Sequence, residues 1–469
     1  MSVRSPSCYS QGCNIAGNTD NNVMRKVFLL VSAMLTVTAM LSCIKDNTLP
    51  MNQVTPDSST DVDDTEQTII LSVRHCGAVA DGVTLDTQAI QSAIDRVSSS
   101  GGGTVLVPSG VYLTGSIWLK DNVNLYLKEG AVIKGSPDID DYCAADCCPQ
   151  NEAEIGWGDY ISGGHLILGV EVSNVSITGQ GRIDGNSDAF MLDKNGKPWS
   201  EKSKIPVRPS QMIWFVDSKD IKVRDVEIAD APYWSLFFLN CENVAVEGCY
   251  VHTKRKEYHT FNSDGIDIDR CRNVTVSNCR VDTSDDCITL RASTAHRLQN
   301  PMDCEMVTVT KCSLSSSCNA IRLGVGEGNI HDAVFSDITI TDTKQAFNIV
   351  GAYVKGNRGT DIYGISFNNI VVEAKELVRI HHMYSPQASI RDIVFDGISG
   401  TAPDVSHIWA KQVAPFKNMV FRNVDVSALV ECVNAEVRIE DGLFKKKELS
   451  SKELQERINN IENNKNLLY

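Results

Sequence analysis

The chain has 469 residues, of which 42% are hydrophobic and 22% are charged, a composition that excludes a disordered chain and a multi-pass membrane protein. Its formal net charge of −15 at pH 7 argues against nucleic acid as a partner, because a binding surface would have to overcome that negative field. The 16 cysteines form no CxxC pairs at zinc-finger spacing, so we expect mostly buried small side chains with one or two disulfides.

Residues 1–43 have the pattern of an export signal. A basic start at 24–26 (Met-Arg-Lys) is followed by an uncharged run, 27–42, that ends at Cys43. This run is too short to span a bilayer comfortably, and the segment resembles a bacterial lipoprotein signal peptide in which Cys43 is lipidated. An ordinary signal peptide with an incidental cysteine is the alternative. We therefore expect an exported protein that touches the outer membrane only through a lipid anchor, on the periplasmic or cell-surface side, or else is secreted.

Residues 44–68 are polar and acidic, which predicts a flexible linker. From 69 to 435, short alternating strands followed by Asn, Asp or Gly keep recurring, as at 220–224, 243–247 and 273–277. From residue 220 onward, successive starts lie roughly 23 to 33 residues apart, which is the range of one solenoid coil. The pattern predicts an all-β protein, a right-handed parallel β-helix.

Two segments flank this predicted β-helix. Apolar residues at helical spacing over 87–97, ended by the glycines at 101–103, predict a helix that caps the N-terminal end of the core. Residues 436–469 are rich in charge and predict a terminal helix, to which we assign no function. Hairpin turns of the Asn-Gly type are scarce, which argues against a β-sandwich, and we expect a monomer.

Three consecutive coils carry the residues that point to chemistry. Aligning segments 262–269, 284–291 and 318–324 puts their apolar residues in two columns that must face the core, since alternate residues of a strand face opposite sides. The outward column between them consists of Asp267, Thr289 and Arg322. A further column, just before the strands, consists of Asp264, Asp286 and Asn319.

Asp264 and Asp286 should be adjacent carboxylates, because neighbouring strands lie about 4.8 Å apart, and Asp285 should lie beside them. Like charges at that distance raise at least one pKa, which a general acid at neutral pH requires. Most aspartates at β-helix turns only accept backbone hydrogen bonds, and we assign Asp220, Asp332 and Asp337 to that class. Three aspartates that converge on consecutive coils favour a catalytic site.

The sequence resembles glycoside hydrolase family 28, the polygalacturonase family, at 262–267 (Asn-Ser-Asp-Gly-Ile-Asp) and 284–288 (Ser-Asp-Asp-Cys-Ile). The resemblance covers about residues 70 to 430 and includes 77–82 (Gly-Ala-Val-Ala-Asp-Gly) and 177–185 (Ile-Thr-Gly-Gln-Gly-Arg-Ile-Asp-Gly). It implies a parallel β-helix that hydrolyses pectic polysaccharides with inversion, without a metal or other cofactor.

By position, the resemblance makes Asp285 the general acid and makes Asp264 and Asp286 the carboxylates that activate water. The chain departs from the family pattern at two places. Asn319 stands where the family has a histidine, and 348–350 (Asn-Ile-Val) stands where it has the Arg-Ile-Lys that grips a galacturonate carboxylate. These departures favour a relative that acts on another pectic linkage or on chain ends.

The sequence leaves open which basic residue replaces Arg-Ile-Lys in binding a substrate carboxylate. A similar string, 378–381 (Val-Arg-Ile-His), occurs one coil late, and Arg322 could supply a guanidinium instead. Pairing of Arg322 with Asp267 is an equal alternative. The expected substrate-binding residues are Asn262, Asp267, Arg291, Asn319, Arg322, Asn348, Arg379 and His381.

Two other functions compete with a glycosidase acting on galacturonan or rhamnogalacturonan. A calcium-dependent pectate lyase shares the fold, and three aspartates near Arg322 could hold calcium. Loss of activity with a chelator and products that absorb in the ultraviolet would identify a lyase. A non-catalytic β-helix that binds glycan is the third candidate, but a binding module has no need of paired carboxylates.

Overall fold

The computed structural model describes residues 69–151, 161–193, 195–198, 207–257, 262–294, 297–353, 355–384 and 386–463. The expected signal peptide, the lipidated Cys43 and the linker 44–68 lie outside the described residues. Within the described ranges, no helix combines the length and the apolar character needed to cross a membrane.

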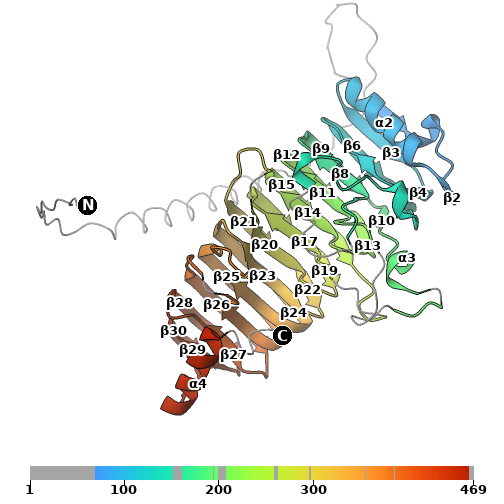
Figure 1. Ribbon diagram of the computed structural model, residues 1–469. Helices are drawn as coiled ribbons and strands as arrows, with labels where there is room; N and C mark the ends of the chain where they lie inside the picture. Colours follow the sequence, from blue (N-terminus) through green and yellow to red (C-terminus); the bar gives the residue numbers. More distant parts are fainter. Residues whose placement is uncertain are drawn as a thin grey trace, which may run out of the picture. The chain divides into compact units, whose positions relative to one another are not determined.

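The strands pair in parallel and stack into three long faces, which the chain visits in turn in every coil (Figure 1). Face 1 contains β1 (Ile69–Ser72), β3 (Gly103–Val107), β6 (Val123–Leu127), β9 (Ser173–Gly179), β12 (Lys219–Arg224), β15 (Glu242–Glu247), β18 (Arg272–Ser277), β21 (Cys304–Thr310), β26 (Arg391–Thr401), β28 (Phe416–Val426) and β30 (Ala435–Gly442). Face 2 contains β2 (Asp81–Leu85), β4 (Gly110–Thr114), β7 (Ala131–Gly135), β10 (Arg182–Asp184), β13 (Glu227–Ala229), β16 (Tyr250–His252), β19 (Arg280–Thr283) and β22 (Ser313–Ser316). Face 3 contains β5 (Ile117–Trp118), β8 (Ile167–Val170), β11 (Ile213–Val216), β14 (Leu236–Leu239), β17 (Ile266–Asp269), β20 (Ile288–Ala292), β23 (Asn319–Gly326), β27 (Ser406–Trp409), β29 (Leu429–Val433) and β31 (Lys445–Lys446). The long strands β24 (Asn329–Val350) and β25 (Asp361–His381) bend through all three faces, and the whole is the predicted parallel β-helix.

The core lies inside the coils and follows the period of two. Ile266, Ile288 and Ile321 pair in register on face 3 and are fully buried, which confirms the predicted inward column. Cysteines fill much of this interior as small apolar side chains. All cysteines that the structure describes are free thiols, so the disulfides expected among them are not formed.

The corner that leads into face 1 explains several of the repeated Asn and Asp residues. Asp220, Asn243 and Asn273 adopt left-handed backbone angles, with φ of 56°, 57° and 57°, a conformation that Asn and Asp tolerate best among non-glycine residues. Their side chains stack from coil to coil, with Asn243 Nδ2 donating to Asp220 Oδ1 at 2.8 Å and Asn273 Nδ2 to Asn243 Oδ1 at 2.7 Å. Asp220 is therefore structural, as predicted.

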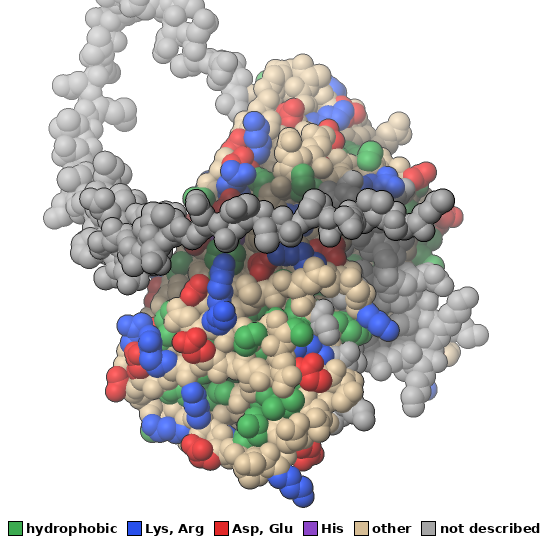
Figure 2. All heavy atoms as spheres, turned by 60° about the vertical axis from the view of Figure 1, so that its left-hand side comes forward, with side chains coloured by type: hydrophobic (Ala, Val, Ile, Leu, Met, Phe, Trp, Pro, Cys, Tyr) green, Lys and Arg blue, Asp and Glu red, His purple; other side chains and the backbone are tan. Residues whose placement is uncertain are grey.

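The outer surface is polar and of mixed charge. Figure 2 shows Lys and Arg side chains interspersed with Asp and Glu side chains over one face of the molecule. Ion pairs between neighbouring coils contribute to this pattern, such as Arg272 with Glu305 at 3.3 Å and Arg422 with Asp396 at 3.5 Å. Pairs as exposed as these stabilise a protein by about 1 kcal/mol or less, so the buried core carries the stability.

Helix α2 (Thr87–Ser99) covers the N-terminal end of the β-helix. Its residues Ile90, Ala93, Ile94 and Val97 are fully buried and recur at helical spacing, because this face packs against the first strands of faces 1 and 3. The predicted capping helix is confirmed, and it extends two residues beyond the expected end.

The C-terminal end differs from the expectation. The coils continue past residue 435, the predicted boundary, because β30 pairs with β28 and β31 pairs with β29. Helix α4 (Ser451–Glu462) follows and begins with a capping box between Ser450 and Glu453. The buried Lys411 side chain holds its last turn by donating to the Ile461 carbonyl at 2.7 Å. The remaining short helices are η1 (Val73–Cys76), η2 (Ile139–Asp141) and α3 (Asp188–Met191).

Candidate active site

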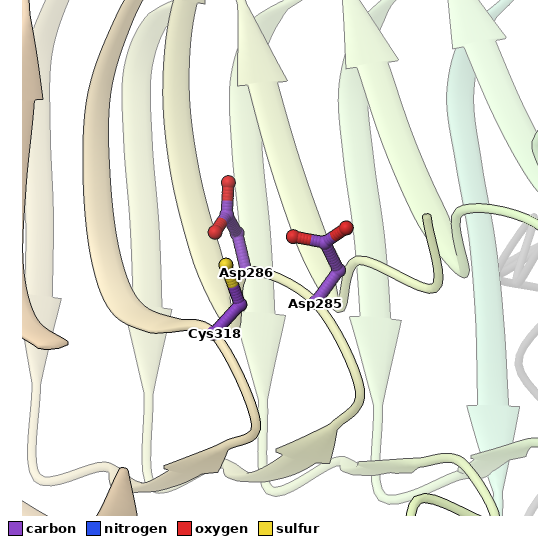
Figure 3. A group of neighbouring side chains, drawn as sticks. All are labelled: Asp285, Asp286 and Cys318. Carbon is purple, nitrogen blue, oxygen red and sulfur yellow. The ribbon is translucent and has the colours of Figure 1, made fainter. Parts of the chain in front are cut away.

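Three carboxylates meet on the outside of face 3. Because Ile266 pairs with Ile288 and Ile288 with Ile321, the residues two positions earlier, Asp264, Asp286 and Asn319, form the predicted column. Asp285 precedes Asp286 in the turn before β20. Figure 3 shows both carboxylates on the same side of that turn, with the Cys318 sulfur of the next coil beside Asp286. The carboxylates line a first cavity of about 60 Å³, formed by Tyr233, Trp234, Asn262, Asp264, Asp285, Asp286, Arg291, Arg322, Val325 and Tyr353.

Asp286 is held by two donors on the next coil. Asn319 Nδ2 donates to Asp286 Oδ1 at 2.5 Å, and Arg322 Nη1 donates to Asp286 Oδ2 at 3.1 Å. Only 2% of Asp286 is exposed, so this is a desolvated, charge-assisted pair. Arg322 also lies over the ring of Tyr353, 4.7 Å from its centre. Of the two alternatives for Arg322, the pairing with Asp267 is wrong, because the side chain turns toward Asp286.

Asp267 pairs instead with Arg291. Arg291 Nη1 lies 3.7 Å from Asp267 Oδ1, and Arg291 Nε lies 3.7 Å from Asp269 Oδ2. Asp267 is completely buried, so the expectation that it contacts substrate is wrong. Arg291 does line the first cavity and stacks 4.2 Å above the ring of Trp234. Asp267 therefore positions Arg291 at the cavity wall.

The protonation of the three carboxylates is set by burial and by their mutual repulsion. Burial, and then the charge of Asp286, raise the pKa of Asp285 to about 6. Burial, followed by the charges of Asp285, Asp267 and Asp286, raises the pKa of Asp264 well above its usual range. The cavity thus combines an acid that holds its proton up to about pH 6 with a carboxylate, Asp286, that is paired to a guanidinium.

A second cavity of about 90 Å³ adjoins the first and shares Arg322 and Tyr353 with it. Four of the predicted substrate-binding residues line it, namely Asn319, Asn348, Arg379 and His381, together with Arg322. Burial, and then the charges of Arg379 and Arg322, lower the pKa of His381 to about 3, so this imidazole is neutral at any working pH. The structure therefore brings these five predicted residues together, next to the carboxylates.

A hydrogen-bonded chain runs from the catalytic column through the wall of this second cavity. Asn348 Nδ2 donates to Asn319 Oδ1 at 3.0 Å and to Gln345 Oε1 at 2.7 Å, and Gln345 Nε2 donates to Glu376 Oε2 at 3.0 Å. Arg379 Nη2 ends the chain by donating to Glu376 Oε2 at 2.6 Å. Asn319 therefore turns its NH₂ group toward Asp286 because its carbonyl oxygen is already bonded.

Gln345 and Glu376 escaped the sequence analysis, although a signal exists. Asn319 pairs with Gln345, and Gln345 pairs with Glu376, so both belong to the column of Asp264 and Asp286. Extending the alignment by two coils would have found them. His407 Nδ1 also lies 2.7 Å from Glu376 Oε1, which leaves Glu376 between two basic side chains.

Arg208 was also missed, and its position follows no repeat. It is fully buried, with Nη1 donating to the Pro232 carbonyl at 2.6 Å and Nη2 to Asn262 Oδ1 at 3.3 Å. Its guanidinium lies 5.0 Å from the ring centre of Tyr233. Arg208 therefore fixes Asn262 and Tyr233, two residues of the first cavity.

The site does not suit calcium. Among the described residues, the only group of potential metal ligands is Asp285, Asp286 and Cys318, whose donor atoms lie within 4.8 Å of one another. Calcium takes six to eight oxygen ligands, whereas this group offers a thiol and a carboxylate that already binds Arg322. The donor chemistry therefore argues against the calcium-dependent lyase.

Comparison with known proteins agrees with the site. Residues 150–440 match the family described as Glycosyl hydrolases family 28, and residues 70–184 match one described as Rhamnogalacturonase A/epimerase, pectate lyase-like. The chain is 27% identical over 302 residues to a probable polygalacturonase of Vitis vinifera, covering 62% of this chain and 59% of that protein. It is 26% identical over 401 residues to an exo-poly-alpha-D-galacturonosidase of Dickeya chrysanthemi, covering 76% and 62% respectively. The chain thus spans about three fifths of the length of these curated relatives.

Solved structures agree with the fold. An exopolygalacturonase from Thermotoga maritima superposes with a TM-score of 0.65 at 21% identity, over 80% of this chain and 92% of that one. A polygalacturonase from Erwinia carotovora gives 0.64 at 18% identity, over 81% and 100%. The fold is thus the parallel β-helix of pectin-lyase-like proteins. The chain belongs to glycoside hydrolase family 28.

Proposed function

We propose that the protein hydrolyses galacturonan with inversion of configuration and acts at chain ends. The observation that carries the proposal is the first cavity, where Asp285 holds a proton up to about pH 6 beside Asp286, which accepts hydrogen bonds from Arg322 and Asn319. A proton donor and a proton acceptor at one site are what hydrolysis of a glycosidic bond requires. Inversion is what the family resemblance implies, and not what the spacing alone would indicate, because carboxyl oxygens of Asp285 and Asp286 lie within 4.8 Å of each other, closer than the roughly 6.5–9.5 Å of most inverting pairs. We take galacturonan as the substrate from the names of the Vitis and Dickeya relatives.

The proposed reaction needs only groups of this chain, substrate and water. Asp285 gives its proton to the glycosidic oxygen as the bond from that oxygen to the anomeric carbon breaks. A water molecule attacks the opposite side of that carbon and passes a proton to Asp286. Asp264 orients this water from the preceding coil, because its carboxyl group lines the same cavity and can form a hydrogen bond with the water.

The walls of the first cavity support action at chain ends. On the N-terminal side of the site, the outward residues of face 3, Leu168, Trp214 and Phe237, are completely buried. Tyr233 and Trp234, which line the cavity, belong to the apolar cluster that covers them. A polymer approaching Asp264 from this side would meet packed aromatic rings, whereas the second cavity opens on the other side.

The decisive experiment is digestion of homogalacturonan, rhamnogalacturonan and their oligomers, with chromatography of the products and proton NMR of the first anomer released. We expect mono- or disaccharides of galacturonate from the start of the reaction, with the anomeric configuration opposite to that of the cleaved bond. Retention of configuration would exclude the proposed mechanism. Unsaturated products would indicate a lyase, and binding without cleavage would indicate a glycan-binding module.

We also infer from the sequence that the protein is exported and anchored by lipid at Cys43. The support is the basic start, the short apolar run and the cysteine at its end. A Cys43→Ala variant should move from the membrane fraction to the soluble fraction of the producing cells and should fail to incorporate labelled fatty acid. Equal membrane association of both proteins would argue against the anchor.

A further inference from the structure

The proposed general acid, Asp285, belongs to a column of residues at equivalent positions in successive coils. Toward the C-terminus, the later members of this column are lysines. Asp285 and Cys318 each stand three residues before a paired isoleucine, Ile288 and Ile321. The next residues of this column, Lys344 and Lys375, precede the paired residues Gln345 and Glu376. With about 4.8 Å between strands, the Lys344 backbone lies roughly 9.6 Å from that of Asp285, within reach of an adjoining sugar unit.

The guanidinium groups around the two cavities are already compensated by carboxylates. Arg322 is paired with Asp286 at 3.1 Å, and Arg379 is paired with Glu376 at 2.6 Å. Neither is available to a substrate carboxylate without breaking a buried ion pair, which is costly. Arg322 and Arg379, the two predicted replacements for the family's Arg-Ile-Lys, are therefore both occupied by ion pairs within the protein.

Lys344 is different. It lines the second cavity, and across the described part of the chain no carboxylate lies within 4.0 Å of its Nζ atom. It also lines a third, open cavity of about 380 Å³ with Lys375 and with the carboxylates of Asp342 and Glu373, of which Asp342 is already paired with Arg255 at 3.0 Å. Two lysines opposite each other on adjacent strands repel, and an anion bound beside them would relieve that repulsion.

We propose that Lys344 binds the carboxylate of the sugar unit on the leaving-group side of the cleaved bond. The inference rests on the proposed hydrolysis of galacturonan, and it names the residue that selects an acidic unit at that position. The side follows from geometry, because Lys344 continues the column of the proton donor, away from Asp264 on the preceding coil. Lys375, one strand further on, would meet the next unit of a longer oligomer.

The test compares Lys344→Met with Lys344→Arg and with Lys311→Met, an exposed lysine at a corner between faces 1 and 2. On galacturonate oligomers, Lys344→Met should raise KM about tenfold and change kcat little, since a charge-assisted hydrogen bond in the bound state is lost. Lys344→Arg should restore most of the affinity, and Lys311→Met should match the wild type. Methyl-esterified oligomers, used as substrates or as competitive inhibitors, should bind Lys344→Met and wild type equally.

Lys375→Met adds a second measurement. It should raise KM for long oligomers but not for the shortest one cleaved. A Lys344→Met enzyme with wild-type KM on acidic oligomers, or with equal losses on esterified ones, would overturn the assignment of Lys344. Failure of the wild type to cleave any galacturonan would instead overturn the proposed function, so the two failures can be told apart.

Discussion

The guanidinium of Arg322 lies 3.1 Å from the carboxylate of Asp286, on the adjacent strand of face 3. This pair, together with the amide of Asn319, gives Asp286, the proposed base, a partner of opposite charge in a nearly water-free position. We therefore expect Arg322 to act on the base, although its position in the sequence suggested a substrate contact.

The first prediction follows for Arg322→Met. This variant should lose about tenfold or more in kcat on acidic and neutral substrates alike, because Asp286 loses its charge partner. Arg322→Lys should retain part of the activity. Arg280→Met is the control, because Arg280 lies over Tyr250 on face 2, away from the site. A rise in KM confined to acidic substrates would show that Arg322 grips substrate after all.

The second prediction concerns the proton donor. Asp285→Asn is nearly isosteric and should fold normally, yet it should lower kcat by about 10² or more, the usual scale of general acid catalysis. Substrates with very acidic leaving groups need less protonation and should show a smaller loss. Steady-state kinetics on both substrate types would measure this difference. Near-normal kcat on oligogalacturonates would exclude Asp285 as the acid.

The third prediction is the pH dependence of activity. The acid must be protonated, and the pKa of Asp285 is raised to about 6, so kcat/KM should fall as the pH rises through about 6. In Asp285→Asn this alkaline limb should disappear from the residual activity. The profile should be recorded with an uncharged or esterified substrate, so that titration of the substrate itself does not contribute.

The fourth prediction is a change of stability with pH. The folded-state pKa of Asp285 exceeds its ordinary value of 3.8, so the folded state binds more protons between these values and the contribution of this group is lost as the pH rises through about 6. Asp285→Asn should therefore be more stable than the wild type at pH 7.5, by on the order of 3 kcal/mol. At pH 3.5 the two should be nearly equal. Urea unfolding at both pH values measures the difference, and equal stability at pH 7.5 would contradict it.

The fifth prediction tests the hydrogen-bonded chain. Asn348→Ala frees the carbonyl oxygen of Asn319, so its amide is no longer held with the NH₂ group toward Asp286. The variant should lose about tenfold in kcat with little change in KM, a typical effect for lost positioning of a catalytic group. Asn368→Ala, on face 1 of the same long strand pair, is the control. A loss of stability without a loss of kcat would indicate a structural role only.

Most of the fold was predictable from the sequence because alternating apolar residues and left-handed Asn or Asp corners repeat in every coil. The same alignment located Asp264, Asp285 and Asp286 correctly, since side-chain columns follow directly from strand register. Which cation would meet which carboxylate was not predictable. Arg322 can reach Asp286 or Asp267, and only the directions of the side chains decide between them.

The residues that the alignment overlooked fall into two groups. Gln345, Glu376 and Lys344 belong to the catalytic columns but carry no aspartate motif, so nothing marked them before the register was known. Arg208 lies in a connection between coils, where no repeat constrains its position, and its contact with Asn262 depends on the fold of that connection. Side-chain positions within the stacked columns can thus be predicted from the sequence, whereas side-chain positions in the connections between coils cannot.

Helix α2, which covers the first coil, has a consequence for the solubility of the protein. A parallel β-helix ends in a ladder of unpaired backbone amides and carbonyls, which would template the edge of another molecule. The buried face of α2, with Ile94 and Val97, shields that ladder at one end. Without the helix, the first coil of one molecule would pair with an exposed coil of another, and repeated pairing would build fibres at high concentration. This short amphipathic helix prevents that association at the N-terminal end.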